Sequence, residues 1–174
     1  MTASTVKSDV VTGFDSVPVD LVAGSVQGNA ERVYMATMEV ATTSIDEVGD
    51  IIKLVRIPSK LRITTVHLFN DDLDSDATPA LEVNVGMYNS ATGLVADAAG
   101  LASAITTLQA ANKTGVNVAN EASDIADIGK TAWEIAGLTA DPGVPFDIAI
   151  TVSQAAATAA TGTVSIIVRG TLDS

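Results

Sequence analysis

Alternation of apolar with polar residues, repeated along the chain, is the feature that most restricts the fold of this sequence. Apolar residues recur with a period of two in the segments 31–42, 50–57, 81–87, 146–153 and 164–169. A period of two places these side chains on one face of an extended strand, whereas a helix needs apolar residues every three to four positions. Turn-forming residues such as Pro58-Ser59 and Asp141-Pro142-Gly143 separate the segments. The sequence therefore predicts half-buried antiparallel strands.

The core of such a protein has to be built from small side chains. Hydrophobic residues make up 47% of the 174 residues, but aromatic residues make up only 3%. Small and β-branched side chains suit two closely spaced sheets better than a core built around large rings. About eight strands are expected, which favours a jelly roll or an immunoglobulin-like sandwich. The absence of cysteine removes support for a true immunoglobulin domain.

Three segments depart from plain alternation. In residues 62–69, apolar residues occupy both parities, which predicts a strand with both faces covered. Near 99–112, a helical spacing of i, i+3, i+4 and i+7 predicts one inserted helix, carried by Leu101, Ala104, Ile105 and Leu108. A short helical turn is expected over 122–128, followed by a strand over 131–136. We expect an extended N-terminal arm, residues 1–30, and a sandwich domain, residues 31–174.

The charge of the chain excludes several classes of partner. Nine Lys and Arg stand against 21 Asp and Glu, giving a net charge of −12. Such a surface repels the phosphates of nucleic acids and the headgroups of anionic lipids. No apolar run approaches the roughly 20 residues that span a bilayer, and residues 1–11 do not resemble a secretory signal. Nucleic acid and membrane are therefore not expected as partners.

The residues that could carry out catalysis are few. His67 is the single histidine, and it lies in an expected strand between Val66 and Leu68. No nucleophile-elbow or phosphate-binding glycine pattern accompanies it. We interpret His67 as a packed or interface residue, and we expect neither an enzyme nor a cofactor.

The acidic run of residues 71–76 is the best metal candidate. Asp72, Asp74 and Asp76 have the alternate spacing with which a loop offers carboxylates to Ca²⁺. The EF-hand pattern then fails, because Ala77 takes the position of the turn glycine and Val83 that of the bidentate glutamate. A solvated loop between strands is the favoured interpretation, and Ca²⁺ binding is the alternative.

Four of the nine cations fall within ten residues, at Lys53, Arg56, Lys60 and Arg62. On an acidic protein such a cluster could bind an acidic surface on a partner or on another copy of the chain. Alternatively, it forms an ordinary solvated hairpin whose charges discourage edge-to-edge association. The cluster is the candidate partner-binding site of the sequence.

Two stretches resemble segments of virion structural proteins of tailed bacteriophages. The first is GDIIKLVRIPSKLRITTVHLFNDDLDSDATPALEVNVGMYN, residues 49–89, where a strand ending in a basic residue and "IP" precedes a "DLD" loop and a strand ending near "VGMYN". The second is WEIAGLTADPGVPFDIAITVSQAAATAATGTVSIIVRG, residues 133–170, with an Ala/Thr-rich connection before the last strand. The resemblance covers roughly residues 31–172, but residues 91–130 match it poorly.

This resemblance implies a jelly-roll capsid decoration (cement) protein, without catalytic residues or cofactor. Such a protein is made in the host cytoplasm and binds the outer surface of the head, where it clamps major capsid subunits. The resemblance also implies a homo-oligomer, with a trimer favoured over a dimer. Two alternatives stay open: a neck, tail or fibre protein of the virion, and a carbohydrate- or Ca²⁺-binding sandwich module.

Overall fold

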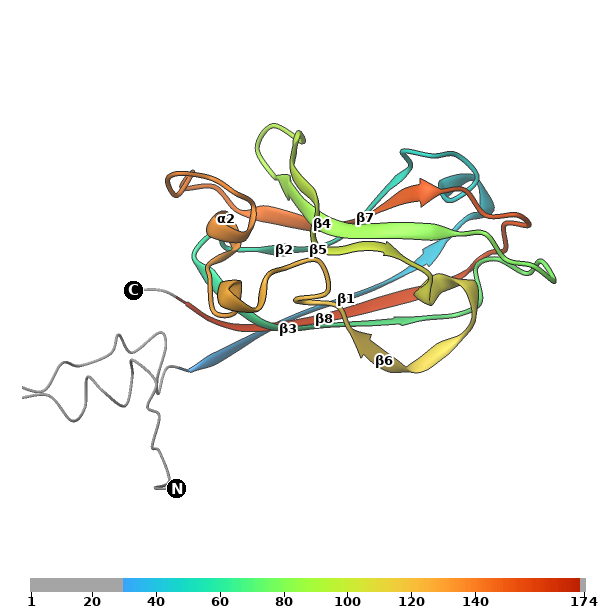
Figure 1. The fold of residues 1–174 in the computed structure, drawn as a ribbon, viewed down its shortest axis with the longest axis horizontal. Helices are drawn as coiled ribbons and strands as arrows, with labels where there is room; N and C mark the ends of the chain where they lie inside the picture. The colour runs from blue at the N-terminus through green and yellow to red at the C-terminus, as the bar shows by residue number, and fades with distance from the viewer. Residues whose placement is uncertain (1–29, 173–174) are drawn as a thin grey trace, which may run out of the picture.

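The protein is a sandwich of two antiparallel sheets (Figure 1). The computed structural model describes residues 30–172, so the predicted N-terminal arm lies outside the described residues except for Ala30. Sheet A contains, from edge to edge, β1 (Glu31–Val40), β8 (Gly162–Leu172), β3 (Leu61–Asn70) and β6 (Asn112–Asn117). Sheet B contains β2 (Ile51–Ile57), β7 (Phe146–Gln154), β4 (Glu82–Asn89) and β5 (Val95–Ile105). The predicted all-β sandwich is confirmed.

The strand order identifies the sandwich as a jelly roll. Sheet A runs β1-β8-β3-β6 and sheet B runs β2-β7-β4-β5. At each position across the sandwich, the two sheets therefore hold strands that are consecutive in the sequence: β1 and β2, β8 and β7, β3 and β4, and β6 and β5. This order arises when a long antiparallel ribbon is wound over two layers, which is how a jelly roll is arranged.

The core between the sheets consists mainly of aliphatic side chains, as the composition predicts. Its largest member is Phe146, which is completely buried. The inner strands contribute alternate residues: β4 buries Val83, Val85 and Met87, and β8 buries Val164, Ile166 and Val168. Each fully buried aliphatic side chain of this size stabilises the fold by about 1.5–3 kcal/mol.

The predicted helix near 99–112 is wrong. Residues up to Ile105 belong to β5, and only a 3-10 turn, η2 (Thr107–Gln109), follows. Leu101 and Leu108 are buried, but Ala104 has a positive φ of 50° and is exposed, so the apolar stripe does not face one way. The pairing of β5 with β4 is interrupted by three register shifts, which hide its strand periodicity in the sequence. Backbone pairing with β4 outweighs a helical spacing of only four residues.

The predicted strand over 131–136 is also wrong, because these residues form the short helix α2 (Ala132–Ile135). Thr131 and Glu134 carry the capping-box spacing: the backbone N–H of Thr131 donates to Glu134 Oε2 at 2.8 Å, and its hydroxyl donates to the same oxygen at 2.6 Å. The helical turn expected over 122–128 is present as η3 (Ile125–Asp127). One further 3-10 turn, η1 (Thr42–Ser44), follows β1.

Irregular pairing changes which residues of β2 face the core. The register of β2 with β7 shifts between Lys53 and Val55. An extra residue in one strand inverts the faces of everything beyond it. Ile52 and Ile57 are consequently both buried, whereas Ile51 is 48% exposed. The uninterrupted period of two expected over residues 50–57 is therefore wrong, because it would place Ile51 and Ile57 on the same face.

The ends of the described chain lie together. Glu31, the first residue of β1, pairs with Thr171, next to the last residue of β8. The two strands are antiparallel neighbours over their whole length, as the adjacent blue and red arrows show in Figure 1. Within residues 30–172, no helix is long and apolar enough to cross a membrane.

Candidate functional site

The four cations Lys53, Arg56, Lys60 and Arg62 do not form one patch. Lys53 and Arg56 are on β2 in sheet B, Lys60 is in the turn after it, and Arg62 is on β3 in sheet A. The Arg62 guanidinium donates to the carbonyl oxygen of Gly129. Closeness in sequence is misleading here because the β2–β3 turn carries the chain from one sheet to the other.

Lys53 and Arg56 are held by a carboxylate that the sequence did not single out, Asp147 of β7. Arg56 donates from Nε and Nη2 to the two oxygens of Asp147, at 2.7 and 3.2 Å, and Lys53 Nζ lies 3.6 Å from Oδ2. The hydrogen bond from Arg56 lowers the pKa of Asp147, against the opposing effect of burial, and raises the pKa of Arg56. Lys53 Nζ also lies 5.6 Å from the centre of the Tyr88 ring. Much of the positive charge on β2 is therefore neutralised within the chain.

The acidic loop is organised around Asp74, whose side chain is buried. Its Oδ2 accepts hydrogen bonds from the backbone N–H groups of Ala80, Leu81 and Ala157 at 2.7, 3.0 and 3.0 Å. Its Oδ1 accepts one from the N–H of Thr158 at 2.9 Å. Burial alone would raise the pKa of Asp74, but the four amides lower it from 3.8 to about 2. Asp74 thus joins its own loop to the β7–β8 connection.

The neighbouring carboxylates also bind protein groups. Asp71 accepts from the N–H of Thr163 at 3.0 Å, and Asp72 accepts from the N–H of Asp74 at 3.1 Å. Both oxygens of Asp76 are engaged, one by Thr78 and the other by the Thr158 hydroxyl at 2.9 Å. Among the described residues, no group of three acidic or histidine side chains has the arrangement of a metal site. The geometry is that of a structural junction between two loops.

Calcium is expected to leave the stability of the protein unchanged. The carboxylates of Asp74 and Asp76 are already occupied by protein donors, so binding a cation would require breaking bonds that order the loop. Titration with CaCl₂ up to millimolar concentration, with thermal unfolding as the readout and MgCl₂ as the control, tests this. A rise in Tm specific to calcium would establish the loop as a site.

His67 lies on the outer face of sheet A, away from the core. The register of β3 with β8 shifts between Ile63 and Thr65, so Ile63 faces inward while His67 and Phe69 face outward. Two strands away, β1 directs Met35 to the same side, with 67% of its surface exposed. We define the outer face of sheet A by Val33, Met35, His67, Phe69 and Ile167.

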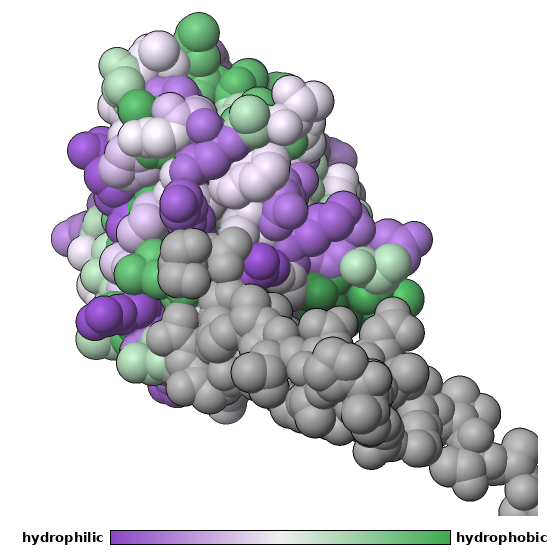
Figure 2. All heavy atoms as spheres, turned by 90° about the vertical axis from the view of Figure 1, so that its left-hand side faces the viewer, coloured by the Kyte–Doolittle hydropathy of each residue, from purple (hydrophilic) through white to green (hydrophobic). Residues whose placement is uncertain are grey.

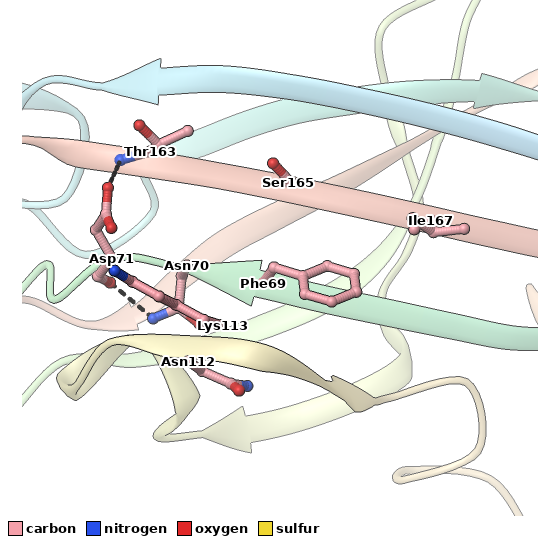
Figure 3. Close-up of a pocket in the computed structure, with 8 residues that line it drawn as sticks. All are labelled: Phe69, Asn70, Asp71, Asn112, Lys113, Thr163, Ser165 and Ile167. Carbon is pink, nitrogen blue, oxygen red and sulfur yellow. Dashed lines mark hydrogen bonds between the residues drawn. The ribbon is translucent and has the colours of Figure 1, made fainter.

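Cross-strand pairing places these side chains in a row. Met35 of β1 pairs with Ile167 of β8, which pairs with His67 of β3. A shallow trough runs along the face, and Figure 3 shows one part of it, with Phe69, Ser165 and Ile167 beside Asn112 and Lys113 of β6. The other part is lined by residues that include Glu31, His67 and Arg169. An apolar centre with charged ends is suited to binding another macromolecule.

The outer face of sheet B has a different character. It carries Lys53 and Arg56, which both pair with Asp147, together with Asn84 and Thr151. Gly86 of β4 is covered directly by the backbone of β5. Ile51 and Val95 expose apolar surface on the edge strands of this face, with 48% and 55% exposed, but the charged and polar residues lie between them.

The pole of the sandwich that carries α2 is shown in Figure 2. Hydrophilic residues extend across the middle of this view, and hydrophobic residues lie at its top and low on both sides. The loop before β7 belongs to this end, where Asp141 accepts a hydrogen bond from the Ser59 hydroxyl at 2.6 Å. That bond lowers the pKa of Asp141 and ties the loop to the β2–β3 turn.

Comparison with known proteins bears on the fold. No protein-family model and no curated protein matches the sequence. A chain of the cyanophage Pam1 capsid asymmetric unit is 24% identical, with a TM-score of 0.61 over 91% of this chain and 96% of that chain. A chain of the capsid of Ralstonia phage GP4 is 18% identical, with a TM-score of 0.58 over 82% of this chain and 86% of that chain. The fold is shared with chains of two phage capsids.

The resemblance of residues 31–172 to phage virion proteins is thereby confirmed for the fold. The Pam1 comparison covers more than nine tenths of both chains. The shared fold is the jelly roll whose outer face and loops are described above.

Proposed function

We propose that this chain is a non-enzymatic structural protein of a phage virion, and within the virion a decoration (cement) protein of the head. The observation that carries the proposal is the jelly roll shared with a chain of the Pam1 capsid over 91% of this chain and 96% of that one. The protein would be made in the host cytoplasm and bound on the outer surface of the capsid. Its partners would be the major capsid protein and other copies of itself.

The proposed mechanism is purely associative. The charged groups with displaced pKa values, Asp74 and Asp147, are engaged in bonds that hold the sandwich together. A rigid block of this kind resists deformation when it bridges two capsid subunits. A standard interface buries about 800 Å² on each partner, and repetition over many sites multiplies the effect. Each bound copy would then oppose separation of the subunits beneath it.

A position at the neck, in the tail or in a fibre is the alternative within the virion. Copy number separates the two, because decoration of a shell requires hundreds of copies, whereas an axial position requires a dozen or fewer. Quantitative mass spectrometry of purified virions, with the major capsid protein as the internal standard, provides the count. A ratio near one copy of this chain per several major capsid subunits supports decoration. A ratio below about one copy in thirty subunits supports a position in the neck, the tail or a fibre.

Shells that lack the protein are expected to lose packaged DNA at a lower temperature than complete shells, because the bridges between subunits are absent. The measurement is release of DNA, followed by dye fluorescence during heating, on virions from which the protein has been deleted. Adding the purified protein back should restore the midpoint. Equal midpoints for bare and decorated shells would rule out stabilisation as the role.

A further inference from the structure

The outer face of sheet A combines an apolar centre with charges at its ends. We propose that this face binds the same face of a second copy, across a two-fold axis that runs parallel to the strands. This deepens the proposed structural function, on which it rests, by naming the surface through which copies of the chain join. A two-fold pair replaces the trimer that the sequence resemblance favours.

The strand order determines what meets what in such a pair. Sheet A runs β1-β8-β3-β6. Rotation by 180° about an axis along the strands reverses this order from side to side and keeps the position along the strands. It therefore lays β1 on β6 of the partner subunit and β8 on β3. In the pair, each contact occurs twice, as in any isologous interface.

Charge selects this axis over the other in-plane choice. Glu39 pairs with Thr163 near one end of the face, and Lys113 lines the same end of the trough as Thr163. With the axis along the strands, Glu39 of each copy faces Lys113 of the partner subunit. An axis across the strands would instead place Glu39 against Glu31, a like charge that is paired with Arg169, and would not bring Glu39 to Lys113. Within residues 30–172, neither Glu39 nor Lys113 forms an ion pair of its own.

The shape of the face fits the same arrangement. Met35 stands out from the middle of β1, with 67% of its surface exposed. Within each chain, the Phe69 ring of β3 rests directly against the backbone of Gly115 on β6, because a Cβ at Gly115 would lie 2.6 Å from that ring. Stacking β1 on β6 at the same level along the strands places Met35 opposite Asn117 of the partner's β6, two residues along that strand from Gly115 and its apolar surface. Contacts between methionine sulfur and aromatic rings are favourable.

The face is large enough for a stable pair. Three strands of about ten residues and the six-residue β6, about 4.8 Å apart, present a projected area of roughly 600 Å². Side chains make the accessible area larger than the projection, and a standard interface needs about 800 Å² per partner. Aligned packing of two sheets is also the arrangement by which the sandwich core itself is built.

Charge reversal tests the proposal on the full chain. Glu39→Lys and Lys113→Glu are each expected to raise the Kd for self-association at least tenfold, measured by sedimentation equilibrium in about 0.15 M salt. The double variant is expected to return the Kd to within about threefold of the original, because each contact is restored with the charges exchanged. Met35→Lys should raise the Kd at least tenfold as well.

The matched control is Ile125→Lys, which replaces a side chain 83% exposed on η3, outside the strands of sheet A, and should leave the Kd unchanged. Thermal unfolding confirms that every variant is folded. Three results would each overturn the proposal: an unsubstituted chain that is monomeric at about 0.1 mM, an unsubstituted chain that forms a trimer, or a double variant whose Kd for self-association is as high as that of the single variants.

A parallel binding assay with bare shells separates this inference from the proposed function. Original chain that binds shells but stays monomeric contradicts the pair and supports the virion role. If Met35→Lys abolishes binding of that monomer to shells, the face belongs to the capsid subunit instead. A chain that pairs but ignores shells contradicts the virion role and supports the pair.

Discussion

Replacing Asp74 with alanine is expected to lower the free energy of unfolding by about 3–5 kcal/mol. The substitution removes one acceptor group and leaves four backbone N–H groups without their partner, two of them on each of two loops. A buried donor without a partner costs the full penalty of its desolvation. Urea unfolding followed by circular dichroism measures the loss.

Asp72→Ala is the matched control. Asp72 lies in the same loop but is exposed and accepts a single hydrogen bond, so its loss should cost under about 1 kcal/mol. Equal effects of the two substitutions would show that Asp74 does not join the loops. Asp74→Asn should be nearly as damaging as the alanine variant, because an amide presents an N–H group to backbone N–H groups.

The pH dependence of stability provides a second check on Asp74. The folded pKa of about 2 lies below the ordinary value of 3.8, so the unfolded chain binds the proton more readily. The stabilisation is therefore fully present above about pH 4 and is lost as the pH falls towards 2. Its size is about 2 kcal/mol. In Asp74→Ala, stability should fall less steeply with pH across this window.

Replacing Gly86 with alanine is expected to cost about 3 kcal/mol or more, and to detach part of β5. A Cβ at this position of β4 would overlap the backbone of Asp97 and Ala98, which crosses directly above it. Backbone atoms of a paired strand cannot rotate away as the end of a long side chain can, so overpacking here exceeds the usual 1–3 kcal/mol. Hydrogen exchange of β5 amides and the urea midpoint together measure the effect.

Gly100→Ala is the control for the glycine. A Cβ there would meet the Asp97 side chain, with its nearest atom at 2.9 Å, and that side chain can turn aside. The expected loss is about 1 kcal/mol or less, with β5 amides still protected. Comparable damage from both substitutions would place the strain in β5 itself and not at its crossing over β4.

The segments with plain alternation predicted the structure well because their strands pair without interruption. The register of β8 with β1 is continuous from Gly162 to Thr171, and the alternating residues Val164, Ile166 and Val168 of β8 are buried, whereas Met38 of the edge strand β1 is 39% exposed. Where an extra residue enters a strand, the same reasoning failed. Ile51 and Ile63 each precede a register shift that leaves no mark in the sequence, so a plain period of two places them on the wrong face relative to the later residues of their strands.

Two features of the surface were only partly visible in the sequence. Apolar residues at both odd and even positions of β3 predicted a strand covered on both faces. Phe69 is the apolar residue of that pattern that lies on the outer face. Val33 and Met35 show the same double pattern in β1 and could have been combined with it. The pairing of Asp147 with Arg56 could not be predicted from the sequence. The two residues are 91 positions apart, and only the adjacency of β2 and β7 brings them together.

The position of the two ends of the described chain determines how the fold bears mechanical force. Glu31 and Thr171 are paired neighbours at one pole. Tension applied through both ends would peel β1 from β8 one hydrogen bond at a time, which is the weakest direction in which a sheet can be pulled. If the protein resists stretching of a capsid surface beneath it, the force must therefore pass through the side-chain contacts of the sandwich and not through the paired ends of β1 and β8.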